Sequence, residues 1–87
     1  MYAIEIEPPA QKFIRKLETR EQDRILKKIE ELRTKPNVGK MLTGQLAGIR
    51  SLRAGDYRVL YKIKENLLTI FILRVGNRKN IYDQISR

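Results

Sequence analysis

The sequence of 87 residues predicts a single α+β domain with the element order β-α-α-β-β-β, in which a helix hairpin packs on one face of an antiparallel four-stranded sheet. Apolar and polar residues alternate near the N-terminus and again in the second half, as they do in half-buried strands. Between these regions, apolar residues recur at the spacing of helices. The chain is too short for two cores, so we expect one domain, residues 1–87.

A change of period marks the first strand and the first helix. Residues 2–7 alternate between large apolar side chains and alanine or glutamate, which predicts a half-buried strand. Pro8 and Pro9 end this strand, and proline is tolerated in the first turn of a helix, where a missing amide hydrogen costs little. Apolar residues then follow at helical spacing, so we expect a helix over residues 9–18.

A second helix is expected over residues 20–34. Thr19 and Gln22 have the spacing of a capping box at its start, and Pro36 follows its end. Its apolar face consists of Ile25, Leu26, Ile29 and Leu32. The break between the two helices is short, so they should form an antiparallel hairpin.

The second half of the sequence predicts a loop followed by three strands. Residues 36–45 mix turn-forming and charged residues and should cross from the helices to the sheet. Strand-like runs cover residues 46–53, 57–64 and 67–75, and the breaks between them are short enough for hairpins. We therefore expect an antiparallel meander.

Strand alternation also predicts which side chains face away from the helices. In the run 57–64, Arg58 lies on the side opposite the large apolar residues. By the same rule, Ser51 and Arg53 share a face, and Arg50 lies on the other. Arg53 should therefore join Arg58, which makes the helix-free face of the sheet basic and concave.

The charge of the chain points to an anionic partner. Lysine and arginine number 19 against 10 acidic residues, a formal net charge of +9. Residues 1–39 carry 9 basic and 7 acidic side chains, whereas residues 40–87 carry 10 basic and 3 acidic ones. A solvated, highly charged surface would explain many of these charges but not their bias. Nucleic acid is therefore the first candidate partner.

The residue types that are missing exclude several kinds of chemistry. The chain has no cysteine and no histidine, which removes disulfides, thiolate catalysis and the commonest zinc ligands. We therefore expect neither a metal nor a cofactor. The N-terminus lacks a signal-peptide pattern and no apolar run is long enough to cross a membrane, so we expect a cytoplasmic protein.

Two segments of the second half resemble the RelE/ParE toxin superfamily. Residues 49–61 read IRSLRAGDYRVLY and residues 75–82 read VGNRKNIY. The likeness extends over the whole chain, including the crossing at residues 40–44, and is most specific at residues 53–58 and 76–78. It implies a RelE-like fold and a toxin of a type II toxin–antitoxin system, with a cognate RelB-like antitoxin that covers its basic face or displaces its end.

The resemblance also implies an activity. RelE-like toxins are ribosome-dependent endoribonucleases that inhibit translation, and they cleave messenger RNA by attack of a ribose 2′-hydroxyl on the neighbouring phosphodiester. This reaction suits a chain without histidine or a metal site, because its chief demand is to stabilise negative charge on phosphate. The ParE branch poisons DNA gyrase instead and has no nuclease activity. A basic nucleic-acid-binding or ribosome-binding module without activity is a third interpretation.

The carry-over from the family assigns site residues. Arg58, Arg78 and Tyr82 correspond to catalytic positions, with the arginines gripping phosphate oxygens. Tyr82 would stack a base, assist proton transfer or simply pack a short final helix onto the sheet. The candidate substrate-binding residues are Lys40, Arg50, Ser51, Arg53, Lys62, Asn77 and Lys79.

This sequence differs from many relatives at two of these positions. Ser51 stands where many have lysine or arginine, and Asn77 stands where many have histidine, so the general base and acid remain unidentified. A bulge would be needed to turn Arg50 outward in place of the missing cation. The other possible substitutes are Lys40, Arg53 and Lys62.

Overall fold

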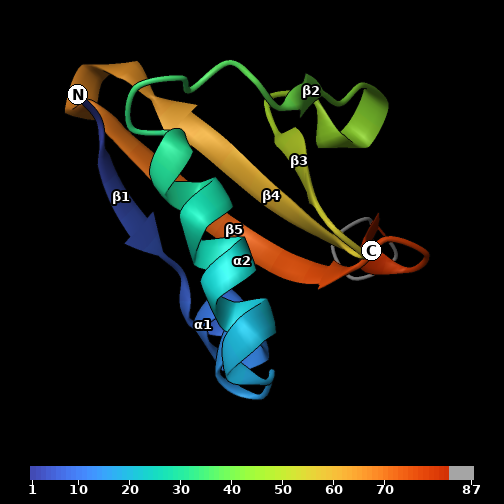
Figure 1. Ribbon diagram of the computed structural model, residues 1–87. Helices are drawn as coiled ribbons and strands as arrows, with labels where there is room; N and C mark the ends of the chain where they lie inside the picture. The colour runs from blue at the N-terminus through green and yellow to red at the C-terminus, as the bar shows by residue number, and fades with distance from the viewer. Residues whose placement is uncertain (83–87) are drawn as a thin grey trace.

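A computed structural model describes residues 1–82 and shows two helices on one face of a five-stranded sheet with the strand order β1-β5-β4-β3-β2 (Figure 1). The elements are β1 (Ala3–Ile6), α1 (Pro8–Arg15), α2 (Thr19–Glu31), β2 (Lys40–Met41), β3 (Arg50–Ala54), β4 (Tyr57–Lys64) and β5 (Thr69–Asn77), with short 3₁₀ turns at Gly44–Leu46 and Glu65–Leu67. The α+β class and the helix hairpin are confirmed.

The sheet differs from the expected one in strand number and direction. It has five strands and is mixed, because β1 pairs in parallel with β5 while the other pairs are antiparallel. The additional strand, β2, lies inside the segment expected to be a loop and is too short to show alternation. Alternation identifies a strand, but it carries no information about which strand lies beside it.

The first residues of the second predicted strand, 46–49, also fall outside the observed strand β3. Leu46 is the last residue of the 3₁₀ turn at Gly44–Leu46, residues 47–49 follow that turn, and the strand begins at Arg50. The last strand begins and ends two residues later than predicted, at Thr69 and Asn77.

The helices are shorter than predicted, and the expected capping box at the start of α2 is wrong. The residue before α2 is Glu18, and its side chain makes no capping hydrogen bond. Gln22 instead donates from Nε2 to the carbonyl oxygens of Ile14 and Arg15, at 2.9 and 3.3 Å. The side chain thus satisfies carbonyls at the end of α1, where a helix lacks internal partners, and ties the two helices together.

The main core lies between the helices and the sheet. It is formed by apolar residues from both helices and from β3, β4 and β5, including Ile25, Ile29, Val59, Tyr61, Ile70 and Ile72. Leu26, expected on the apolar face of the second helix, is 41% exposed and lies at its edge. None of the helices in the described part of the chain has the length and apolar character needed to span a membrane.

Tyr61 and Arg50 hold the loop that leads into β2. The Tyr61 hydroxyl donates to the carbonyl oxygen of Pro36 at 2.7 Å and accepts from the amide of Gly39 at 2.9 Å. Arg50 donates from Nη1 to the carbonyl oxygens of Asn37 and Gly39, at 3.2 and 2.9 Å. These contacts set β2 beside β3.

Candidate functional site

The face of the sheet opposite the helices is basic. The pairing register puts Arg53, Arg58 and Gly76 in one row across this face and Lys40, Ser51, Leu60 and Arg74 in the next. The predicted meeting of Arg53 and Arg58 is confirmed, because they are direct cross-strand partners. The residues that β2 to β5 direct to this face include no carboxylate, and Glu5 of β1 lies beyond Phe71 at the far edge.

Ser51 is the centre of a small polar cluster on this face. Its side chain is 2% exposed, and its Oγ accepts hydrogen bonds from Arg58 Nη1 at 3.3 Å and from the Tyr82 hydroxyl at 3.1 Å. A serine oxygen has two lone pairs, so both acceptor positions are used. The structure therefore brings Arg58 and Tyr82, which were predicted to be catalytic, together at Ser51, which was predicted to bind substrate.

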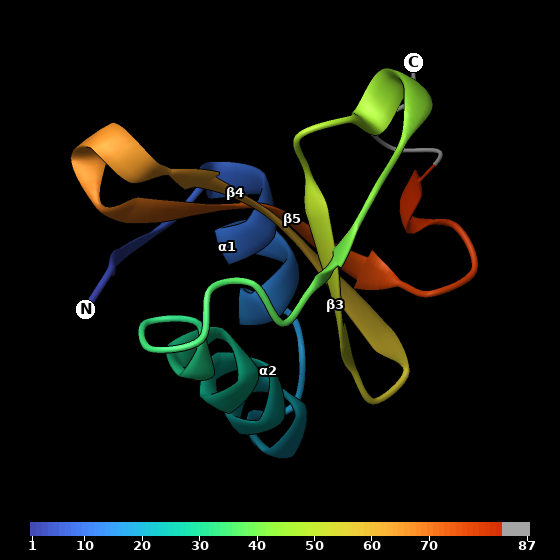
Figure 2. The same cartoon turned by 90° about the horizontal axis from the view of Figure 1, so that it is seen from above.

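The segment that carries Tyr82 lies over the helix-free face. Leu60 and Ile81 are both fully buried, yet neither belongs to the core cluster beneath the helices. Leu60 is the register partner of Ser51, to which Tyr82 bonds. In Figure 2 the helices lie on one side of the sheet and the red C-terminal segment on the other. Tyr82 is half-buried with helical backbone, and the rest of the expected final helix, residues 83–87, lies outside the described residues.

Arg78 lies in the turn that follows β5, beside the turn between β3 and β4. Its amide donates to the carbonyl oxygen of Asp56 at 3.2 Å, which joins the two turns. A hollow of about 420 Å³ at this point is lined by Asp56, Asn77, Arg78 and Lys79. Three predicted site residues are therefore neighbours here. Arg58 lies opposite Gly76, and Gly76 precedes Arg78 by two residues, so this turn begins close to Arg58.

The other predicted cations are spread around the cluster. Lys40 is exposed at the edge of the sheet and is the cross-strand partner of Ser51. Arg53 is exposed and donates from Nε to the carbonyl oxygen of Gly55 at 3.2 Å. Lys62 is exposed farther along β4, on the same face as Arg58. Lys40 is thus the predicted substitute closest in register to Ser51.

Arg50 does not join this group. Its register with β4 is continuous, so no bulge turns it outward, and it lies on the helix side with both Nη1 contacts made to loop carbonyls. The geometry gives Arg50 a structural role in holding the loop before β2.

Sequence reasoning missed Arg74, which lies on the helix-free face because of an irregularity in β5. The register changes from Leu60 opposite Arg74 to Tyr61 opposite Ile72, which leaves Leu73 without a partner. Simple alternation from Ile70 and Ile72 would direct Arg74 into the core. The signal that was available is the core pair Ile72 and Val75, which are three residues apart.

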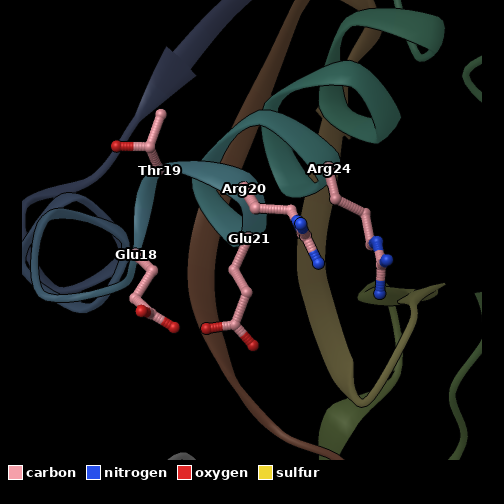
Figure 3. Close-up of a pocket in the computed structure, with 5 residues that line it drawn as sticks. All are labelled: Glu18, Thr19, Arg20, Glu21 and Arg24. Atoms are coloured by element: carbon pink, nitrogen blue, oxygen red, sulfur yellow. The ribbon is translucent and has the colours of Figure 1, made fainter.

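A second hollow, of about 660 Å³, lies at the start of α2 and has mixed charge. It is lined by Glu18, Thr19, Arg20, Glu21 and Arg24, with acidic and basic side chains side by side (Figure 3). Glu21 accepts a hydrogen bond from the Tyr57 hydroxyl at 2.8 Å, and this carboxylate raises the pKa of Tyr57. The two glutamates and the position on the helix side make this hollow a poor match for phosphate.

The basic face contrasts with the helices in its ion pairing. Among residues 1–82 the one ion pair joins Glu30 and Arg33, beside the end of α2. The arginines of the helix-free face therefore have no carboxylate partner within the described chain. In the same part of the chain, no group of three or more acidic side chains has the arrangement of a metal site.

Comparison with known proteins identifies similar toxins. The family model described as the ParE toxin of the type II toxin–antitoxin system, parDE, matches residues 4–82. Toxin RelG of Mycobacterium tuberculosis is 51% identical over 45 residues, which are 52% of this chain and 52% of RelG. The matched segment thus spans about half the length of that relative.

Solved structures match over most of the chain. The toxin–antitoxin complex RelBE2 from Mycobacterium tuberculosis matches with a TM-score of 0.81 and 35% identity, covering 88% of this chain and 98% of that chain. The isolated RelE toxin of E. coli matches with a TM-score of 0.75 and 25% identity, covering 97% and 94%. The archaeal RelE–RelB complex from Pyrococcus horikoshii matches with a TM-score of 0.72 and 26% identity, covering 88% of this chain and 94% of that chain.

Proposed function

Because this chain belongs to the RelE/ParE superfamily of type II toxin–antitoxin toxins, we propose that it is a ribosome-dependent endoribonuclease that cleaves messenger RNA and so inhibits translation. The observation that carries the proposal is the contact of Arg58 and Tyr82 with the buried Ser51, on a sheet face whose central strands present no carboxylate. Such a surface is suited to a polyanion.

The proposed reaction uses a nucleophile that RNA supplies itself. The ribose 2′-oxygen forms a bond to the adjacent phosphorus, the bond from phosphorus to the 5′-oxygen breaks, and the products are a 2′,3′-cyclic phosphate and a free 5′-hydroxyl. The 2′-hydroxyl loses its proton and the leaving oxygen gains one. Negative charge builds up on the non-bridging oxygens during this step, so fixed cations lower the barrier.

In this mechanism the arginines stabilise charge. Arg58 is partly held in place by Ser51, so part of its ordering cost is met before substrate binds. Arg78, exposed in the turn after β5, would reach the same phosphate from the side of the hairpin ends. Each guanidinium offers two parallel donors to phosphate oxygens.

Tyr82 has a ring that is half-buried and a hydroxyl that is bonded to Ser51. We assign it to base stacking or to passing a proton to the leaving oxygen. Lys40, Arg53, Lys62 and Lys79 would supply positive potential around the reacting phosphate, and Asn77 would supply a hydrogen bond to phosphate or base.

The experiment is cleavage of messenger RNA on programmed ribosomes by purified protein, with the ends of the products identified. Wild type should produce a cyclic phosphate and a 5′-hydroxyl at the cut. Arg58→Ala and Arg78→Ala should each lower the rate by about 10²- to 10³-fold, the usual loss for one contact to a developing oxyanion. Lys27→Ala, on the exposed side of α2, is the matched control and should cleave normally. Intact message with wild-type protein would overturn the proposal.

A second candidate, poisoning of DNA gyrase without nuclease activity, is favoured by the family model, which is described for ParE toxins. A supercoiling assay separates the two functions. Inhibition of gyrase by wild type, together with unchanged ribosomal message, would make this the function instead.

We also propose a cognate RelB-like antitoxin as partner. Two of the solved relatives are toxin–antitoxin complexes, RelBE2 and the archaeal RelE–RelB. An acidic partner segment would suit the basic sheet face. Expression of the chain alone should arrest growth, and co-expression with the product of the adjacent gene should restore it.

A further inference from the structure

We propose that Arg74 is a further phosphate-binding residue of the helix-free face, placed there by the bulge in β5, and that it contacts the RNA backbone beside the phosphate held by Arg58. This inference rests on the proposed function, since its ligand is single-stranded RNA.

The bulge decides the direction of the Arg74 side chain. Leu73 has no partner in β4, while Arg74 is directly opposite Leu60 and Val75 is directly opposite Val59. Cross-strand partners share a face, so Arg74 lies on the side of Leu60, away from the helices. Bulges of this kind often re-aim a side chain beside a functional site.

The same register puts Arg74 next to Arg58. Arg58 pairs with Gly76, and Arg74 precedes Gly76 by two residues on the same face of β5. The two arginines are therefore diagonal neighbours, a position in which long side chains reach each other, at about 7–8 Å between Cα atoms. Gly76 has no side chain, so none from that position stands between them.

Arg58 and Arg74 are neighbouring cations without a carboxylate partner in the described chain, an arrangement that favours binding of an anion. Arg74 is half-buried, and the one hydrogen bond that its side chain makes within the described chain runs from Nη1 to the carbonyl oxygen of Leu73 at 2.9 Å. No carboxylate in residues 1–82 forms an ion pair with it. Like charges at this spacing repel, so a phosphodiester between or beside them would relieve a cost that the folded protein otherwise carries.

The proposed ligand is the phosphodiester backbone of a single strand of RNA. Ser51 and Leu60, the neighbours of Arg58 and Arg74 on this face, are covered, because Ser51 is 2% and Leu60 0% exposed, whereas both arginines are half-buried. An extended strand would therefore contact the two arginines and not the residues beneath them, with one phosphate at Arg58 and another at Arg74. Arg74 would thus contribute to binding of the strand more than to the chemical step.

The test measures RNA binding as a function of salt. The probe is a short single-stranded RNA in which every ribose carries a 2′-O-methyl group, which prevents cleavage. The logarithm of the binding constant should fall linearly with the logarithm of salt concentration, and one lost phosphate contact should reduce the slope by about 0.7 for a single strand. We compare wild type with Arg74→Met and Arg74→Gln, with Lys27→Met as the control on the helix side.

Both neutral variants should bind about tenfold more weakly at low salt, with the reduced slope. Arg74→Lys should keep the wild-type slope, because the charge remains, but bind more weakly since the planar fork is lost. Lys27→Met should match wild type. Arg74→Gln keeps a donor for the Leu73 carbonyl, so it remains informative if the methionine variant unfolds. Wild-type slope and affinity in a folded neutral variant would overturn the role of Arg74.

A ribosomal cleavage assay separates this outcome from failure of the proposed function. If wild type cleaves message and the Arg74 variants bind RNA normally, the proposed function stands and the role of Arg74 falls. If wild type leaves message intact and does not bind the RNA, both are overturned.

Discussion

The hydroxyl of Tyr82 lies 3.1 Å from Oγ of Ser51, 31 residues earlier in the chain. The contact joins the C-terminal segment to the middle of the sheet and reaches the same oxygen that Arg58 contacts. Ser51 is buried, so it has no room to meet a substrate directly. The position where many relatives carry a cation is used here to organise two neighbouring side chains.

Substitution of Ser51 by alanine tests this organising role. Arg58 and Tyr82 would lose their shared acceptor, so we expect ribosomal cleavage to fall by about tenfold, below the loss for removing an arginine itself. Each lost hydrogen bond is worth about 1 kcal/mol of folding stability, so the melting temperature should fall by several degrees. Thr19→Ala, at the first residue of α2 and on the helix side of the sheet, is the control and should change neither quantity.

Two variants of Tyr82 separate its hydroxyl from its ring. Tyr82→Phe removes the bond to Ser51 but keeps the ring, and Tyr82→Ala removes both. If the hydroxyl passes a proton, the phenylalanine variant should lose nearly as much kcat as the alanine variant. If the ring stacks on a base, phenylalanine should retain most activity. Equal and normal cleavage by both variants would remove Tyr82 from the site.

Gly39→Ala should destabilise the fold. A Cβ at this position would lie 2.5 Å from Oη and 2.6 Å from Cε1 of Tyr61, and Tyr61 is fully buried. Overpacking of this kind costs about 1–3 kcal/mol, which urea unfolding will measure. Gly44→Ala introduces a Cβ with nothing within 4 Å, but at a positive φ of 66°, so its effect isolates backbone strain from the clash. Unchanged stability of Gly39→Ala would show that the loop before β2 moves freely.

Stability should fall at alkaline pH. Burial is the main cause that raises the pKa of Tyr61, and the hydrogen bond to Glu21 is the main cause that raises the pKa of Tyr57. A phenol whose pKa is higher in the folded state stabilises the fold below its unfolded pKa, near 10, and this contribution is lost as pH rises through the folded pKa. The free energy of unfolding should therefore be flat to about pH 9 and decrease above pH 10.

Tyr57→Phe provides the control for the alkaline transition. It removes one of the shifted phenols, so the decrease above pH 10 should become shallower. An identical pH dependence in wild type and variant would show that the contact with Glu21 does not persist in solution.

The sequence determined the local elements and the direction of most side chains. Periods of two and 3.6 residues are intrinsic to strands and helices, so Arg58, Arg53 and the apolar residues of α2 could be assigned without a structure. The excess of positive charge in the second half was equally visible. The burial expected for Leu26 was wrong because a periodic pattern does not show where the neighbouring helix stops covering it. The capping box was wrong because Gln22 bonds to a carbonyl at the end of the other helix, a partner that local spacing cannot reveal.

The tertiary structure alone decided which elements meet. Strand alternation does not show which strand lies beside which. The structure alone therefore revealed that β1 pairs in parallel with β5 and that Lys40 lies opposite Ser51. The bulge at Leu73 gives Arg74 the direction opposite to the one that simple alternation from Ile70 and Ile72 would give, and long-range folding brought Tyr82 onto Ser51. Individual arginines were evident from the sequence, whereas the meeting of Arg58 and Tyr82 at one buried serine depends on contacts between residues far apart in the chain.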